Sequence, residues 1–256
     1  MDEQLRNRFL TLWPGFFPDT DLPFTFEITD TPRDFPHAPV PDGWRCLICD
    51  LHKVRKGASL FFDDSSVTCQ GGKIYSGFQK TRSPEFRYFL SYGKEGVVRG
   101  ERYKKTPEMV DETTRRMDSL PSEGKGLLFR RWDKLDGNDN PEVVIFFARP
   151  EVLSGLFTLA NFDQTEPDGV ICPFGSGCSS IIHYPWLEQQ KERPRAVLGM
   201  FDPSARKCVA ADILTFAVPM KKFTVMIADM EESFLTTETW ESVRKKIRQS
   251  NTVHAR

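Results

Sequence analysis

Apolar and polar residues alternate in several short stretches of the chain, and this alternation is typical of β-strands. The alternation predicts strands at residues 24–28, 59–62, 67–69, 126–132, 143–148, 169–172, 195–201 and 212–219. The segment Asp136–Asn140, between two of these strands, is rich in Asp, Asn and Gly. Because such residues favour tight turns, we expect a hairpin there.

Apolar residues at helical spacing predict helices between the strands. The predicted helices cover residues 44–56, 107–120, 150–162, about 179–184, about 220–235 and 238–249. Gly57 ends the first helix, and Pro107 begins the second. Residues 13–44 hold seven prolines, so an extended, turn-rich segment is expected there.

The order of these elements predicts an α+β fold. Strands mix with helices and with antiparallel hairpins, so we expect one mixed or antiparallel sheet with flanking helices. No shift in composition marks a linker, and the chain is therefore expected to form a single domain over residues 1–256, with a proline-rich N-terminal segment at 13–43.

Composition excludes several classes of protein. Hydrophobic residues make up 39% of the 256 residues and charged residues 28%, which excludes a disordered chain and a bundle of membrane helices. A formal net charge of −1 indicates no nucleic-acid partner. The charged start of the chain lacks the pattern of a signal peptide, so a cytoplasmic protein without membrane attachment is expected.

The chain holds six cysteines, which are the residues most suited to chemistry. They stand at positions 46, 49, 69, 172, 178 and 208. Because cytoplasmic thiols stay reduced, these cysteines are expected to be free, metal-bound or redox-active rather than paired in structural disulfides. Cys208 is interpreted as an ordinary buried apolar residue.

Cys46 and Cys49 form a Cys-x-x-Cys pair after Trp44. A pair at a helix start is typical of thioredoxin-like dithiols, which also need a buried strand just before it. The proline-rich residues 35–43 do not fit such a strand. On a helical wheel the two cysteines lie roughly 140° and 160° from the centre of the apolar stripe, so either a second face is buried or a thiol points into a site.

Glycines lie next to the other candidate thiols. Gly71 and Gly72 follow Cys69, whereas Gly175 and Gly177 lie between Cys172 and Cys178, and Cys178 is predicted at a helix start. Glycine permits close backbone approach, so these four glycines are candidates for contact with a bound cofactor or anion, and plain turns are the alternative.

Familiar motifs are absent from the sequence. It contains no second Cys-x-x-Cys pair, no His-Glu-x-x-His and no four-cysteine ferredoxin run. Of two basic runs, 244–248 is interpreted as a solvated helix face, whereas 99–105 is a candidate for an anionic ligand. No catalytic acid or base, substrate or oligomeric state is assigned.

Five segments, taken in order, resemble the uncharacterised domain-of-unknown-function family 169 of archaea and bacteria. They are Cys49 to Gly57, Val67 to Gly72 with Gly77, Val143 to Glu151, Gly177-Cys178 and Ala217 to Pro219. The resemblance covers about residues 40–235 and implies a recurring cysteine trio, which matches Cys49, Cys69 and Cys178 here. It implies no established activity.

The favoured hypothesis is a convergent cysteine site for metal, iron–sulfur or redox chemistry. Its predicted ligands are Cys49, Cys69 and Cys178, with Cys172 or Cys46 as a spare. Thiolates favour an iron–sulfur cluster or, alternatively, zinc over hard cations such as Mg²⁺. The other possibilities are a non-catalytic module that binds an unidentified small molecule, with the cysteines merely packed, and a thiol sensor that forms a reversible disulfide.

Overall fold

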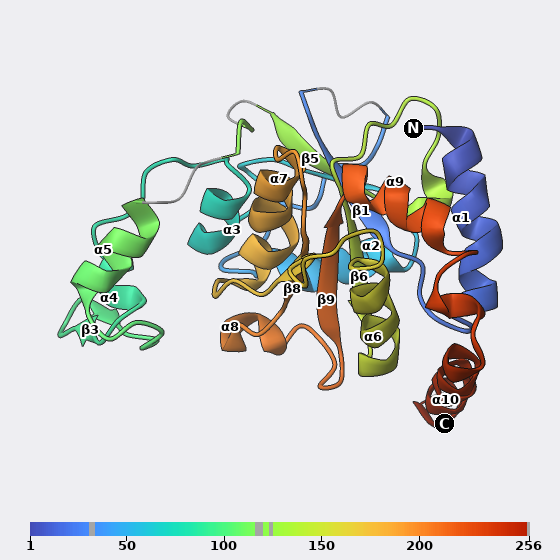
Figure 1. Ribbon diagram of the computed structural model, residues 1–256. Helices are drawn as coiled ribbons and strands as arrows, with labels where there is room; N and C mark the ends of the chain where they lie inside the picture. Colours follow the sequence, from blue (N-terminus) through green and yellow to red (C-terminus); the bar gives the residue numbers. More distant parts are fainter. Residues whose placement is uncertain (31–33, 116–119, 123–124, 255–256) are drawn as a thin grey trace.

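The computed structural model describes residues 1–30, 34–115, 120–122 and 125–254. Within these ranges the chain forms a seven-stranded sheet in the order β2-β5-β1-β6-β9-β8-β7, with helices on both faces (Figure 1). Neighbouring strands are antiparallel except β7 and β8, which are parallel. The predicted single-domain α+β fold with a mixed sheet is therefore confirmed.

The strands follow most of the predicted positions. They are β1 (Phe24–Thr29), β2 (Leu60–Phe62), β3 (Gly93–Lys94), β4 (Val98–Arg99), β5 (Gly126–Arg131), β6 (Val143–Ala148), β7 (Val170–Ile171), β8 (Ala196–Gly199) and β9 (Leu214–Pro219). The short strands β3 and β4 form a separate two-stranded sheet.

The helices connect and cover these strands. The α-helices are α1 (Glu3–Phe16), α2 (Leu47–Arg55), α3 (Gln70–Tyr75), α4 (Phe86–Phe89), α5 (Pro107–Arg115), α6 (Pro150–Leu159), α7 (Tyr184–Gln189), α8 (Pro203–Arg206), α9 (Met220–Asp229) and α10 (Glu238–His254). Shorter helical turns are η1 (Trp132–Lys134), the π-helical turn η2 (Ser179–His183) and η3 (Phe234–Thr236).

Alternation along the central strands creates two cores, one on each face of the sheet. In β6, Val144 and Phe146 point into the first core, whereas Val143 and Ile145 point into the second. Helices α1, α6, α9 and α10 cover the first core, and they gather on the right in Figure 1. Helix α2 and the turn η2 supply buried residues to the second core, where most of the cysteines also lie.

A small lobe stands apart from the sheet. Helices α4 and α5 and the β3–β4 hairpin form it, at the far left of Figure 1. Its apolar contacts join Ile74 of α3 to Phe86 and Val110. The helix predicted at 107–120 is observed as α5 as far as Arg115, and residues 116–119 lie outside the described part of the chain.

The hairpin predicted at Asp136–Asn140 is wrong, because β1 lies between β5 and β6 in the sheet. The polar residues of this segment instead stabilise a longer connection, which passes over β1 from β5 to β6. Arg130 of β5 pairs with Asp136 at 3.0 Å and with the buried Asp139. The segment therefore spans a strand rather than turning tightly between neighbours.

Two further predictions also need correction. Residues 67–69 form no strand, because Asp63 Oδ1 accepts hydrogen bonds from the amides of Ser65 and Ser66, both at 3.0 Å, and turns the chain toward α3. The extended segment expected from residue 13 begins later, since α1 continues to Phe16 through Pro14.

Every helix in the described part of the chain is too short or too polar to cross a lipid bilayer.

Candidate cysteine site

Three free cysteines stand at the starts of three helical segments that meet in the second core. Cys46 is the N-cap residue of α2, Cys69 that of α3, and Cys178 that of η2. All three are buried, with 8%, 7% and 4% of their surface exposed. Backbone amides at a helix start carry partial positive charge, so this arrangement favours negative charge on the sulfur atoms.

The sulfur of Cys69 lies at the centre of this group. The thiols of Cys178 and Cys46 donate hydrogen bonds to it, and so do the amides of Leu47 and Gly72. These donors, Cys178 first, hold the pKa of Cys69 far below its ordinary value of 9.0. The arrangement therefore favours the charged form of Cys69 over the charged form of either neighbouring thiol.

The two neighbouring thiols behave in the opposite way. The hydrogen bond to Cys69 and burial raise the pKa of Cys46 and of Cys178 above 9.0. Negative charge is therefore favoured at Cys69 and disfavoured at Cys46 and Cys178, because a second charge in this buried space would be repelled by the first.

Gly72 allows α3 to pack against the central sulfur. A Cβ atom at Gly72 would lie only 2.6 Å from Cys69 Sγ and 2.8 Å from Val67 Cγ1. At Gly71 the nearest atoms would be 3.9 Å away, in the ring of Tyr75. Of the two glycines predicted to contact a cofactor here, Gly72 lies against the site and Gly71 has open space.

The second pair of predicted glycines lies beside Cys178. A Cβ at Gly177 would lie 2.7 Å from the Cβ of Ala205 and 3.3 Å from Ile48 Cγ1, so its absence lets α2, α8 and η2 meet. The Gly177 amide also donates to the buried Asp202 at 3.2 Å. At Gly175 a Cβ would overlap Ser179 Oγ.

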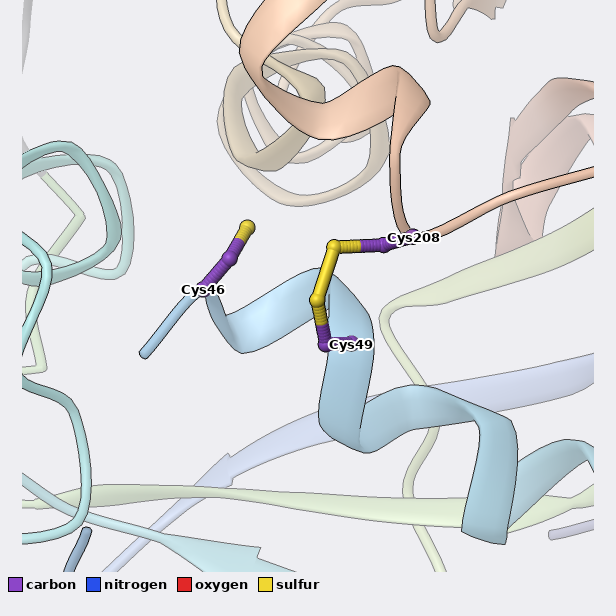
Figure 2. Close-up of side chains that lie close together, drawn as sticks. All are labelled: Cys46, Cys49 and Cys208. Atoms are coloured by element: carbon purple, nitrogen blue, oxygen red, sulfur yellow. A yellow bond between two sulfur atoms is a disulfide. The ribbon is translucent and has the colours of Figure 1, made fainter. Parts of the chain in front are cut away.

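A disulfide between Cys49 and Cys208 adjoins the three thiols. The sulfurs of Cys46, Cys49 and Cys208 all lie within 4.8 Å of one another (Figure 2). Cys49, predicted as a metal ligand, is thus bonded to another sulfur. The interpretation of Cys208 as an ordinary buried apolar residue is wrong, because Cys208 is paired with Cys49.

Of the four predicted ligands, the structure brings Cys69 and Cys178 into direct contact. Cys49 lies beside Cys46, within 4.8 Å of its sulfur, whereas Cys172 is exposed after β7. The sequence interpretation treated Cys46 only as a spare, although its place before the apolar run of α2 indicates an N-cap. No pattern around Cys208 signals its pairing.

The rim of the site is aromatic and partly charged. Trp44, just before the cysteine pair, is 61% exposed, and the Nζ of Lys207 lies 4.5 Å from the centroid of its ring. The rings of Tyr75 in α3 and His183 in η2 lie 5.7 Å apart, and burial raises the pKa of Tyr75. The three cysteines pack among buried side chains from both halves of the sequence.

The fold and this geometry define an α+β protein whose sheet carries a buried cysteine site on one face. The chain belongs to the domain-of-unknown-function family 169, described as uncharacterised ArCR, whose family model matches residues 17–229. This match confirms the resemblance noted in the sequence. Neither the curated proteins nor the solved structures contain a match to the chain.

Proposed function

We propose that the protein binds a soft metal ion or an iron–sulfur cluster through Cys46, Cys69 and Cys178. The observation that carries the proposal is the group of three buried cysteines, in which Cys69 accepts hydrogen bonds from the thiols of Cys46 and Cys178. A buried charge is normally paired or bound to a metal. A soft metal would replace the two thiol protons and be held by three thiolates.

The number of available sulfurs limits the form of the metal centre. Three cysteines leave one position of a tetrahedral zinc site for another ligand, or one iron of a four-iron cluster open. While the disulfide is closed, Cys49 and Cys208 are not available as thiolates. Cys46 therefore replaces Cys49 in the proposed ligand set, and the exposed Cys172 is left out of it.

Metal analysis of protein purified without oxygen tests this proposal. We expect iron or zinc in the wild-type protein, with visible absorption if a cluster is present, and loss of the metal in Cys69→Ser and Cys178→Ser. The matched control is Cys172→Ser, which removes a cysteine outside the buried group and keeps the metal. A metal-free wild type after anaerobic reconstitution, or full metal content in folded Cys69→Ser, contradicts the proposal.

A cavity favours a second candidate function, a module that binds a small molecule. It has a volume of about 280 Å³ and lies beside the end of β6. Its charged lining comprises Asp19, Asp21, Arg55, Arg149, Glu151 and Asp212. Four carboxylates face two guanidinium groups there, so a neutral or cationic ligand fits better than an anion.

Thermal unfolding in the presence of small neutral and cationic compounds tests the second candidate. A ligand in this cavity would raise the melting temperature of the wild type, and Asp212→Asn would weaken that effect. An equal shift in both proteins would place binding elsewhere. The cytoplasmic location, the absence of nucleic-acid partners and the identity of any ligand remain predictions.

A further inference from the structure

Cys46 is a free thiol placed directly beside a disulfide. Its sulfur lies within 4.8 Å of the sulfurs of both Cys49 and Cys208 (Figure 2). A thiolate attacks a disulfide sulfur and displaces the other sulfur, so three sulfurs in close contact are the minimum for an exchange reaction. The sulfurs of Cys46, Cys49 and Cys208 therefore provide the three atoms that the exchange requires within one chain.

We propose that Cys46 exchanges with this disulfide, so that one bond moves between the Cys49–Cys208 and the Cys46–Cys49 pairings. In the reaction a Cys46–Cys49 bond forms and the Cys49–Cys208 bond breaks. The proton of Cys46 ends on the released Cys208 sulfur, so one thiol is consumed and one thiol is formed. The number of disulfides is unchanged, and no oxidant or reductant is consumed.

Local structure selects Cys49 as the sulfur that is attacked. Cys46 and Cys49 lie three residues apart at the start of α2, and the Cys49 amide donates to the Cys46 carbonyl at 3.0 Å. Disulfides between cysteines at this spacing and position are well formed in proteins. Cys208 follows the four-residue helix α8 on a half-buried segment, which suits a leaving group that must move away.

The exchange rests on the positions of these three sulfurs and does not require the proposed metal. If the metal site also exists, the two are linked, because the Cys46–Cys49 pairing removes one of the three proposed ligands. Exchange would then regulate the metal site without any change in the overall oxidation state of the protein.

Peptide mapping of the full-length protein tests the exchange. The protein is treated with a chelator, incubated without reductant in N-ethylmaleimide and digested with trypsin after the reagent is removed. Cleavage after Arg45, Lys53, Lys207 and Lys221 leaves Cys46 with Cys49 on one peptide and Cys208 on another. The two pairings therefore differ as a linked peptide pair and a single peptide with an internal disulfide.

We expect N-ethylmaleimide to label Cys208 in the wild type while Cys49 stays unlabelled, because Cys49 remains bonded to Cys46. Ordinary reduction would label both residues. In Cys46→Ser the labelling of Cys208 should be lost, and Cys172→Ser should behave as the wild type. A wild type in which only the linked peptides appear overturns the proposal, as does equal labelling of Cys208 in Cys46→Ser.

One variant separates this proposal from the metal proposal. Cys178→Ser removes a proposed ligand but none of the three exchanging sulfurs. It is expected to lose metal and still to show labelling of Cys208, so failure of either proposal is visible independently of the other. If Cys46→Ser does not fold, the internally bonded peptide of the wild type alone decides the question.

Discussion

Gly72 has no side chain, and this allows the backbone of α3 to lie close to the sulfur of Cys69. Two residues follow Cys69 before this position is reached, so the first turn of α3 folds back over the thiol. The amide of Gly72 donates to that sulfur, while its Cα leaves space for the sulfur atom. The Gly72 amide and the absence of a Gly72 side chain therefore both affect the sulfur atom of Cys69.

We predict that Gly72→Ala destabilises the protein by about 1–3 kcal/mol, the usual cost of overpacking a core. The added methyl group would overlap Cys69 Sγ and Val67 and would also reduce metal content. Gly71→Ala is the matched control, because its Cβ has space and alanine favours a helix. Urea denaturation measures both, and equal effects of the two substitutions would contradict this explanation.

The unequal pKa values of the thiols predict a stability maximum near pH 9. Folded Cys69 releases its proton more readily than the unfolded thiol, whose ordinary pKa is 9.0, so its contribution to stability grows as pH rises toward 9 and is lost as pH falls. For Cys46 and Cys178 the folded pKa is raised, so their contribution is present below 9 and is lost as pH rises above it.

Urea denaturation of metal-free protein between about pH 6 and pH 10 measures this dependence. Histidine, tyrosine and the amino terminus also titrate in or near this range, so the difference between the wild-type profile and that of Cys69→Ser isolates the contribution of the thiols. In Cys69→Ser the maximum in the free energy of unfolding should flatten, because the thiol with the lowered pKa is removed. A profile of the same shape in wild type and variant would show that the three thiols are not coupled.

At the scale of elements, the sequence predicts the helices of the site better than their contacts. The spacing of Leu47, Leu51 and Val54 and the turn at Gly57, where φ is +99°, place α2 within a few residues. The pairing of Cys49 with Cys208 joins α2 to the segment after α8, 159 residues away. Local sequence patterns carry no information about this contact. The two cysteines come together only because the strands that lie between them in the sequence pair in a particular order.

Removal of the disulfide should destabilise the protein by about 2–5 kcal/mol, because it closes a long loop in the unfolded chain. The double variant Cys49→Ser/Cys208→Ser avoids a leftover thiol that would pair with Cys46. Urea denaturation with and without reductant measures the effect. Reductant should lower the free energy of unfolding of the wild type to that of the double variant. If reductant also lowers the free energy of unfolding of the double variant, the assignment of the bond is contradicted.

At the scale of the whole molecule, the order of strands and helices in the sequence predicted the α+β fold with a mixed sheet and flanking helices. It did not predict which strands are neighbours. The segment Asp136–Asn140 has the composition of a hairpin, yet its carboxylates bind Arg130 while the chain crosses β1. Strand order depends on the packing of distant elements, such as the N-terminal strand that enters between β5 and β6.

The separation of the two cores predicts that damage to one spares the other. Trp240 of α10 packs against Phe17 and Phe234 in the first core, on the face opposite the cysteines. Trp240→Ala should cost about 3–5 kcal/mol. Because the cysteine site belongs to the second core, the metal content of the folded variant should be unchanged.

Trp44→Ala is the control for this substitution. The Trp44 ring is exposed and is approached by Lys207, so its loss should cost about 1 kcal/mol or less. Thermal or urea denaturation gives the stabilities, and elemental analysis gives the metal content. Loss of metal in folded Trp240→Ala would show that the two faces of the sheet are not independent.

The bond between Cys49 and Cys208 makes a covalent ring of the chain between them. This ring holds β2, β5, β6, β7 and β8, whereas β1 and β9 lie outside it in sequence and are inserted between its strands in the sheet. The lobe with β3 and β4 also belongs to the ring. While the Cys49–Cys208 pairing holds, a protease that nicks the lobe once therefore opens the ring without releasing a fragment, and the two pieces migrate separately on a gel only after a reducing agent is added.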